Sequence, residues 1–195
     1  MIAGLLLAAG GSRRFGAQKL VATLHGVPLV RRAFDSLASA VDCVIVVVGS
    51  DAADVRSALE STKATIVVNP DWDHGLSTSI RRGIAAVPLN VEAVIIALGD
   101  EPQVDARIGV ELIAEWRNSK RPIVAARYNG VQSHPVLFDR SVFIELAGLE
   151  GDVGAKRVIH RSAGRVAFVD VASARPIDVD LPADLRRLSE PMADD

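Results

Sequence analysis

Small residues followed by basic residues lie near the start of the chain. Residues 7–19 read Leu-Ala-Ala-Gly-Gly-Ser-Arg-Arg-Phe-Gly-Ala-Gln-Lys. Small side chains let the backbone approach a ligand and leave N–H groups free for anionic oxygens. The guanidinium of Arg13 and the ammonium of Lys19 would add positive charge at the same place. The segment therefore predicts a triphosphate site, with N–H groups offered to the phosphates by Gly10, Gly11 and Ser12.

Two well-known phosphate loops differ from this segment. A P-loop requires Lys followed by Ser or Thr directly after its second glycine, but Ala-Gln-Lys follows Gly16. A dinucleotide fingerprint requires three glycines at a fixed spacing, which these glycines do not have. The alternative interpretation is a flexible surface loop that happens to be basic.

Carboxylates at two places in the chain are candidate metal ligands. Asp100 follows the apolar run at residues 93–98, and Asp178, Asp180 and Asp184 lie close together near the end. Mg²⁺ prefers hard oxygen ligands and keeps several waters, so one or two carboxylates beside a phosphate loop suffice. Alternation predicts that Asp178 and Asp180 share one strand face. Asp184 is expected to cap or charge the start of a helix, and capping is also the alternative role of Asp100.

A polar segment precedes a helix at residues 69–80. It reads Asn-Pro-Asp-Trp-Asp-His-Gly-Leu-Ser-Thr-Ser-Ile. Free N–H groups and hydroxyls at a Ser/Thr-rich helix start suit a ligand. Capping of the helix by Ser77 or Thr78 is the alternative role. His74 is discounted as a metal ligand because lone surface histidines usually bind no metal.

The elements that must position these groups alternate along the chain. Apolar runs at residues 2–8, 44–48, 64–68 and 93–98 are typical of strands buried on both faces. Helix-like stretches occupy residues 29–40, 52–59, 77–87 and 106–117. This order predicts an α/β fold with a parallel sheet, whose ligands bind at the carboxyl ends of the strands.

The pattern changes after about residue 121. Strands at residues 122–128 and 131–138 are joined by Asn129 and Gly130, a strong hairpin signal. A helix at 140–146, a strand at 166–171 and a helix at 182–188 complete the expected elements. We therefore expect a single domain over residues 1–195, a three-layer α/β/α sandwich around a mainly parallel sheet.

Composition excludes several classes of protein. The formal net charge of −2 lacks the basic excess of general nucleic-acid or membrane-surface binding. No apolar stretch approaches the ~20 residues of a membrane span. Cys43 is the only cysteine, so neither an intrachain disulfide nor a thiolate zinc cluster can form. A cytoplasmic location is the expectation.

The motifs together resemble the MobA-like NTP transferases, which have a Rossmann-like fold of the nucleotide-diphospho-sugar transferase type. Residues 7–10 are most similar to the molybdenum cofactor cytidylyltransferase branch, although Phe15 replaces a usual Met. Asp100 matches the family's Asp-X-Pro, and residues 180–184 resemble its Asp-Thr-Pro-Glu-Asp ending. The resemblance implies that Asp100 and Asp180 bind Mg²⁺. It implies nucleotide contacts for Leu7, Ala8, Ala9, Gly10, Gly11, Ser12, Asn69, Gly75 and Ser79.

Two later segments resemble the acceptor side of the same family. Residues 132–138 are similar to its Gly-His-Pro-Val segment, with Ser133 in place of glycine, and residues 149–156 match a Gly-Asp-X-Gly-Ala stretch. The resemblance implies acceptor contacts from His134, Gly151 and Asp152. A structural histidine and a plain turn are the alternatives.

The implied reaction transfers CMP from CTP to Mo-molybdopterin and releases pyrophosphate, with Arg13 and Lys19 neutralising the phosphates. The product would pass to a client molybdoenzyme. Within enzymes, the alternatives are GTP as donor and a sugar or alditol phosphate as acceptor. A non-catalytic carrier of the molybdenum cofactor is the alternative of another class. A nucleotide sensor that keeps the fold is a further one, because Ser133, Leu181 and Ala183 depart from the family's pattern.

Overall fold

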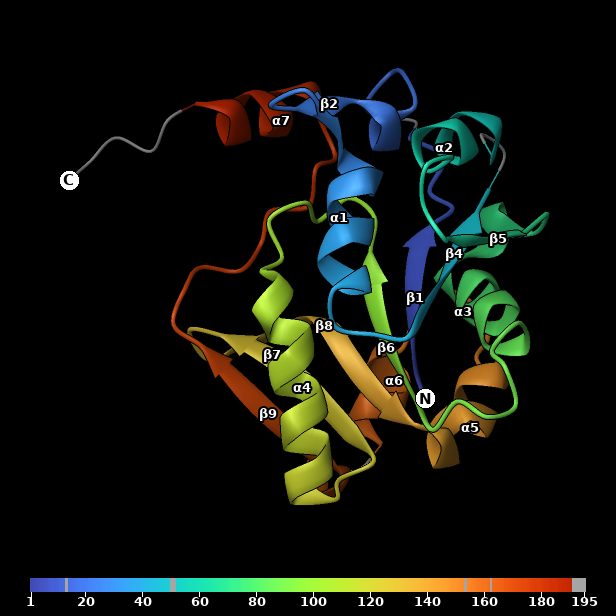
Figure 1. Cartoon of the computed structure of the whole chain (residues 1–195), viewed down its shortest axis with the longest axis vertical. Helices are drawn as coiled ribbons and strands as arrows, with labels where there is room; N and C mark the ends of the chain where they lie inside the picture. Colours follow the sequence, from blue (N-terminus) through green and yellow to red (C-terminus); the bar gives the residue numbers. More distant parts are fainter. Residues whose placement is uncertain (13, 50–51, 153, 162, 191–195) are drawn as a thin grey trace.

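The apolar runs of the sequence form one seven-stranded sheet (Figure 1). The computed structural model describes residues 1–12, 14–49, 52–152, 154–161 and 163–190. Across the sheet the strands lie in the order β5-β4-β1-β6-β8-β7-β9. Their bounds are β1 (Ile2–Ala8), β4 (Cys43–Val48), β5 (Thr65–Val68), β6 (Ala93–Leu98), β7 (Ile123–Tyr128), β8 (Val131–Asp139) and β9 (Val166–Val171).

Strand β8 is the one strand of the described sheet that runs against its neighbours. Strand β1 pairs in parallel with β4 and β6, and β9 pairs in parallel with β7. Strand β8 is antiparallel to both β6 and β7. The hairpin turns at Asn129 and Gly130, with φ of 45° and 85°. Positive φ at both positions is the geometry that favours Asn-Gly. The predicted mainly parallel sheet and its hairpin are therefore confirmed.

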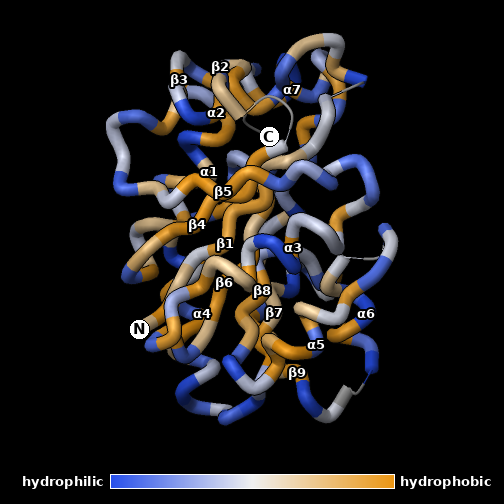
Figure 2. Tube along the Cα trace, turned by 90° about the vertical axis from the view of Figure 1, so that its right-hand side faces the viewer, coloured by the Kyte–Doolittle hydropathy of each residue, from blue (hydrophilic) through white to orange (hydrophobic). Residues whose placement is uncertain are grey.

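Helices cover both faces of the sheet, which gives three layers. Successive side chains of a strand point to opposite faces, so Leu6 and Leu5 enter two different cores. The first core is closed by α1 (Leu29–Ala38), α2 (Ala52–Ala58) and α4 (Ala106–Ser119). The second is closed by α3 (Leu76–Ala85), α5 (Phe143–Ala147) and α6 (Lys156–His160). Figure 2 shows the hydrophobic trace concentrated in the strands between these layers.

A third, smaller core anchors the C-terminal part of the chain. Helix α7 (Pro182–Ser189) lies beside the short paired strands β2 (Thr23–Leu24) and β3 (Val27–Pro28) (Figure 1). Val179 is fully buried there against Leu24, Leu29 and Leu188. The backbone N–H of Val179 donates to the carbonyl of Asp100 at 3.0 Å. This packing brings the C-terminal segment to the end of β6.

Each predicted strand and helix overlaps an observed element, with one exception at the C-terminal carboxylates. Asp178 and Asp180 belong to no strand, so the predicted alternation does not apply to them. Asp178 instead pairs with Arg175 at 3.0 Å, whereas Asp180 reaches Lys19. Among the described residues, no helix has both the length and the apolar character needed to cross a membrane.

Candidate active site

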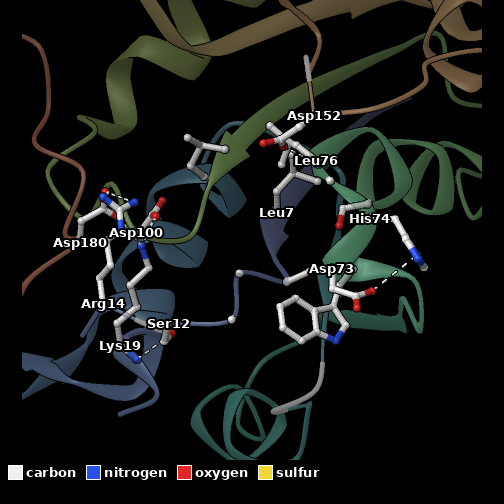
Figure 3. A pocket seen from close by; sticks show the side chains of 17 residues that line it. Leu7, Ser12, Arg14, Lys19, Asp73, His74, Leu76, Asp100, Asp152 and Asp180 are labelled. Carbon is white, nitrogen blue, oxygen red and sulfur yellow. Dashed lines mark hydrogen bonds and ion pairs between the residues drawn. The ribbon is translucent and has the colours of Figure 1, made fainter. Parts of the chain in front are cut away.

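A pocket of about 620 Å³ opens at the carboxyl ends of β1 and β6 (Figure 3). This volume is within the range usual for small-molecule sites. The segment after β1 and the end of β6 form one part of the wall, and the segment after β5 forms another. The pocket therefore lies where the parallel strands predicted a ligand.

Lys19 joins two carboxylates at one end of this pocket. Its ammonium donates to Asp100 Oδ2 at 2.6 Å and to Asp180 Oδ1 at 3.0 Å. Burial alone would lower the pKa of Lys19, but the two carboxylates outweigh burial and raise it. Lys19 is therefore a fixed positive charge, only 7% exposed, between two groups from distant parts of the chain.

The segment after β1 is closed on itself by side-chain hydrogen bonds. The backbone N–H of Lys19 donates to Ser12 Oγ at 3.1 Å, and that hydroxyl donates to Gln18 Oε1 at 3.0 Å. Gln18 Oε1 also accepts from the N–H of Leu20 at the start of the short helix Lys19–Val21. These contacts hold Lys19 next to the glycines of the same segment.

Asp180 is positioned by the start of α7. Asp184 Oδ2 accepts from the N–H of Asp180 at 3.1 Å and from that of Leu181 at 2.8 Å. These backbone donors lower the pKa of Asp184, first through Leu181 and then through Asp180. The predicted capping role of Asp184 is thus confirmed. Arg14 adds a second cation, 2.9 Å from Asp180 Oδ2.

The two carboxylates fit a divalent cation. Asp100 and Asp180 both reach one nitrogen atom, so their oxygens converge on a single position. Within the described part of the chain, no group of three or more His, Cys, Asp or Glu side chains forms a fuller metal site. Mg²⁺ commonly takes one or two carboxylates and completes its shell with substrate phosphates and water.

The other end of the pocket is built around a buried amide. Asn69 Nδ2 donates to Thr78 Oγ1 at 2.9 Å and to Ser79 Oγ at 3.0 Å. Its Oδ1 accepts from the N–H of Asp71 at 3.1 Å. Asn69 is 2% exposed and does not line the pocket. Asn69 thus fixes the segment that carries Ser79, and its contact with a nucleotide stays a prediction.

Gly75 brings a distant segment to the start of α3. Its φ is +107°, and a Cβ there would lie 3.0 Å from Gly151 O. The first N–H of the helix, on Leu76, donates to Asp152 Oδ1 at 3.2 Å. Asp152 therefore supplies a cap, and the side chains of Ser77 and Thr78 do not. Asp152 lines the same pocket as Lys19 and Asp100, and its acceptor contact stays a prediction.

The indole of Trp72 covers two glycines of this pocket. A Cβ on Gly11 would lie 2.4 Å from the ring, and one on Gly49 would lie 3.0 Å from it. Trp72 lines the pocket, and so do Asp73 and His74 beside it. Aromatic rings provide a stacking face for nucleobases, so this end suits the base of a nucleotide.

The structure brings together most of the predicted site residues. The pocket is lined by Leu7, Ala9, Gly10, Gly11, Ser12, Lys19, Gly75, Ser79, Asp100, Asp152 and Asp180. Ala8 points into the first core instead, and Gly151 packs behind Gly75. The predicted Arg13 lies outside the described residues. Arg14 and Trp72 line the pocket and were not predicted.

His134 stands apart from this pocket. Burial lowers its pKa to about 4, so the imidazole is neutral at pH 7. Its backbone carbonyl accepts from the hydroxyl of Tyr128 at 3.1 Å. A neutral, partly buried ring gives no charge to a phosphate, and these contacts favour the structural alternative for His134.

The comparison with known proteins agrees with this site. The family model described as the MobA-like NTP transferase domain matches residues 4–166. The chain belongs to the MobA-like NTP transferase family. It is therefore a nucleotidyltransferase of that family. Lys19 and Asp100 lie within the matched residues, and Asp180 lies beyond them.

Individual relatives of this MobA-like protein have different names. Nicotine blue oxidoreductase from Paenarthrobacter nicotinovorans is 28% identical over 198 residues, covering 96% of both chains. A probable molybdenum cofactor guanylyltransferase from Natronomonas pharaonis is 28% identical over 197 residues, again covering 96% of both. Both relatives span nearly the whole chain, so the similarity is not confined to residues 7–19.

Among solved structures, Rv0371c from Mycobacterium tuberculosis H37Rv has a TM-score of 0.87 at 31% identity, covering 97% of this chain and 98% of that one. A complex of the same protein with manganese has a TM-score of 0.80, covering 96% and 97%.

Proposed function

We propose that the protein transfers CMP from CTP to the phosphate of a molybdopterin-type acceptor and releases pyrophosphate. The observation that carries the proposal is the contact of Lys19 with Asp100 and Asp180 beside the glycines that follow β1. This arrangement places cations, N–H donors and carboxylates in one pocket. The similarity to a probable molybdenum cofactor guanylyltransferase supports the class of acceptor.

The chain's own residues contribute charge and position to the reaction. Gly10 and Gly11 would offer N–H groups to the phosphates, and Lys19 with Arg14 would neutralise the departing pyrophosphate. The acceptor phosphate is ionised at neutral pH, so no side chain has to remove a proton. Asp100 and Asp180 would hold Mg²⁺, which when bound supplies Lewis-acid stabilisation of phosphate charge. The manganese complex of Rv0371c supports a divalent cation.

Analysis of the reaction product would show which nucleotide the protein uses as donor. The resemblance of residues 7–10 to the cytidylyltransferase branch favours CTP, whereas the named guanylyltransferase relative favours GTP. Incubation with each NTP, Mg²⁺ and molybdopterin, followed by mass analysis, would identify the dinucleotide formed. We expect the cytosine dinucleotide and one pyrophosphate per turnover. A carrier would bind the pterin and release no pyrophosphate.

Hydride transfer is the second candidate activity. Nicotine blue oxidoreductase is 28% identical over 96% of the chain, as is the guanylyltransferase relative. The same incubations with NADH or NADPH and an oxidised aromatic substrate, followed by absorbance, separate the two activities. Cofactor oxidation without pyrophosphate release would overturn the transferase proposal.

Asp100→Asn is the sharpest mutational test of the proposed chemistry. We expect pyrophosphate release to fall by about 10²-fold or more at saturating Mg²⁺, the scale of losing one electrostatic group from such a site. The thermal midpoint should stay close to that of the parent protein. Asp105→Asn, which changes the exposed cap of α4, is the matched control and should keep normal turnover. Normal turnover of Asp100→Asn would remove the metal-ligand role.

A further inference from the structure

Three side chains of the pocket share one cation position. The ammonium of Lys19 lies between Asp100 Oδ2 and Asp180 Oδ1, at 2.6 Å and 3.0 Å (Figure 3). The side chain of Lys19 is 9% exposed, and those of the two aspartates are 23% and 36% exposed. The ammonium thus fills the place on which both carboxylates converge.

The same two oxygens are the ones that fit a divalent cation. An ammonium and a divalent cation cannot both occupy a position this small, because like charges a few ångströms apart repel strongly away from bulk water. Binding of the metal to both aspartates therefore requires the ammonium of Lys19 to move.

The backbone around Lys19 allows such a movement without unfolding the pocket. Its N–H is held by Ser12 Oγ at 3.1 Å, while the ammonium is at the end of a flexible four-carbon stem. Gly10 and Gly11 line the same pocket. A triphosphate bound to their N–H groups would offer the ammonium a new anionic partner.

We infer that the ammonium of Lys19 holds Asp100 and Asp180 together in the free protein and yields their oxygens to a divalent cation when a triphosphate draws it away. The metal and the nucleotide consequently bind cooperatively, and each raises the affinity for the other by the same factor. The identity of the triphosphate rests on the proposed function. The exchange of cations rests on the contacts of Lys19 alone.

Titration with Mn²⁺, followed by the electron paramagnetic resonance signal of the free ion, tests this exchange without any turnover. In the parent protein, we expect a non-hydrolysable CTP analogue to tighten Mn²⁺ binding at least 10-fold. Lys19→Met removes the competing charge, so it should bind Mn²⁺ at least 10-fold more tightly than the parent protein when no nucleotide is present. The tightening by the analogue should be smaller in this variant, because only the direct contact of the phosphates with the metal remains.

Two further variants separate charge from packing. Lys19→Arg keeps a cation and should retain the weak Mn²⁺ binding of the parent protein. Lys63→Met changes an exposed lysine outside the pocket and should leave both titrations unchanged. The thermal midpoint of each variant reports folding. If Lys19→Met does not fold, Lys19→Gln removes the charge and keeps a hydrogen-bond donor, and the same prediction applies to it.

Equal or weaker Mn²⁺ binding by the uncharged variant, in the absence of nucleotide, would overturn the inference. That result would mean that Lys19 does not compete for the carboxylate oxygens. The outcome is independent of the proposed function, because a protein that transfers no nucleotide still gives the nucleotide-free titration. A parent protein that transfers no nucleotide, but in which Lys19 competes with Mn²⁺ as expected, would count against the proposed reaction. It would not count against the exchange of the ammonium for the metal.

Discussion

At the scale of single residues, the missing side chain of Gly11 makes room for the Trp72 ring. A Cβ on Gly11 would lie 2.4 Å from that ring, so Gly11→Ala must displace the indole from its place in the pocket wall. We expect CTP to bind about 10-fold more weakly, the scale of losing one base–aromatic contact. Isothermal titration would measure this. Gly164→Ala, whose Cβ would meet nothing within 4 Å, is the control. Unchanged CTP affinity in Gly11→Ala would exclude the ring from the base site.

Residue types were easier to predict than the direction in which each side chain points. Lys19 and Asp100 were predictable as partners because both follow strands, and strand ends meet at one edge of the sheet. Nothing in the sequence shows that the donors of Asn69 are taken by Thr78 and Ser79. Trp72 was not predicted for a similar reason. Its ring lies over Gly11 and Gly49, which are far from it in the sequence.

At the scale of secondary structure, the start of α7 determines where Asp180 lies. Asp184→Ala would remove the acceptor of the Asp180 and Leu181 N–H groups. We expect the free energy of unfolding to fall, as for the loss of other helix caps. We also expect slower pyrophosphate release, because Asp180 is no longer held at Lys19. Urea unfolding and a turnover assay would measure the two effects.

The cap of another helix, α4, provides the matched control for Asp184→Ala. Asp105 caps α4 and accepts from the N–H of Arg107 at 2.8 Å. Asp105→Ala should cost a similar free energy and leave turnover unchanged. Equal loss of turnover in both variants would show that general destabilisation, and not the position of Asp180, is responsible.

Long apolar runs made the main strands predictable, because a strand buried on both faces leaves a continuous signal. Strands β2 and β3 have two residues each, too few to show a period. The strand expected at Asp178 and Asp180 is absent because residues 177–181 are held by packing of Val179 and by α7 instead of a sheet neighbour.

At the scale of the whole molecule, the site depends on three distant parts of the chain. Lys19 lies 81 residues from Asp100 and 161 residues from Asp180. The topology of a parallel sheet predicts the first meeting. The second depends on the small core around Val179, which the sequence pattern does not reveal. The choice of nucleotide base depends on the exact positions of single side chains, which neither the sheet topology nor the small core determines.

The stability of the whole protein should depend on pH through Glu101. This carboxyl is 2% exposed, and its Oε2 accepts no hydrogen bond from the described residues. Burial, followed by the charge of Asp178, raises its pKa from 4.5 to about 9. Between these two values the folded protein keeps a proton that the unfolded chain releases. The free energy of unfolding should therefore fall as pH rises, by at most about 1.4 kcal/mol per pH unit.

Glu101→Gln isolates this contribution because an amide does not ionise. Urea unfolding of both proteins at pH 7, 8 and 9 would measure it. His134, whose pKa burial lowers from 6.5 to about 4, is present in both proteins, so its contribution cancels in the comparison. The parent protein should lose stability across the series more steeply than Glu101→Gln. Parallel curves would mean that Glu101 is already ionised in the folded protein.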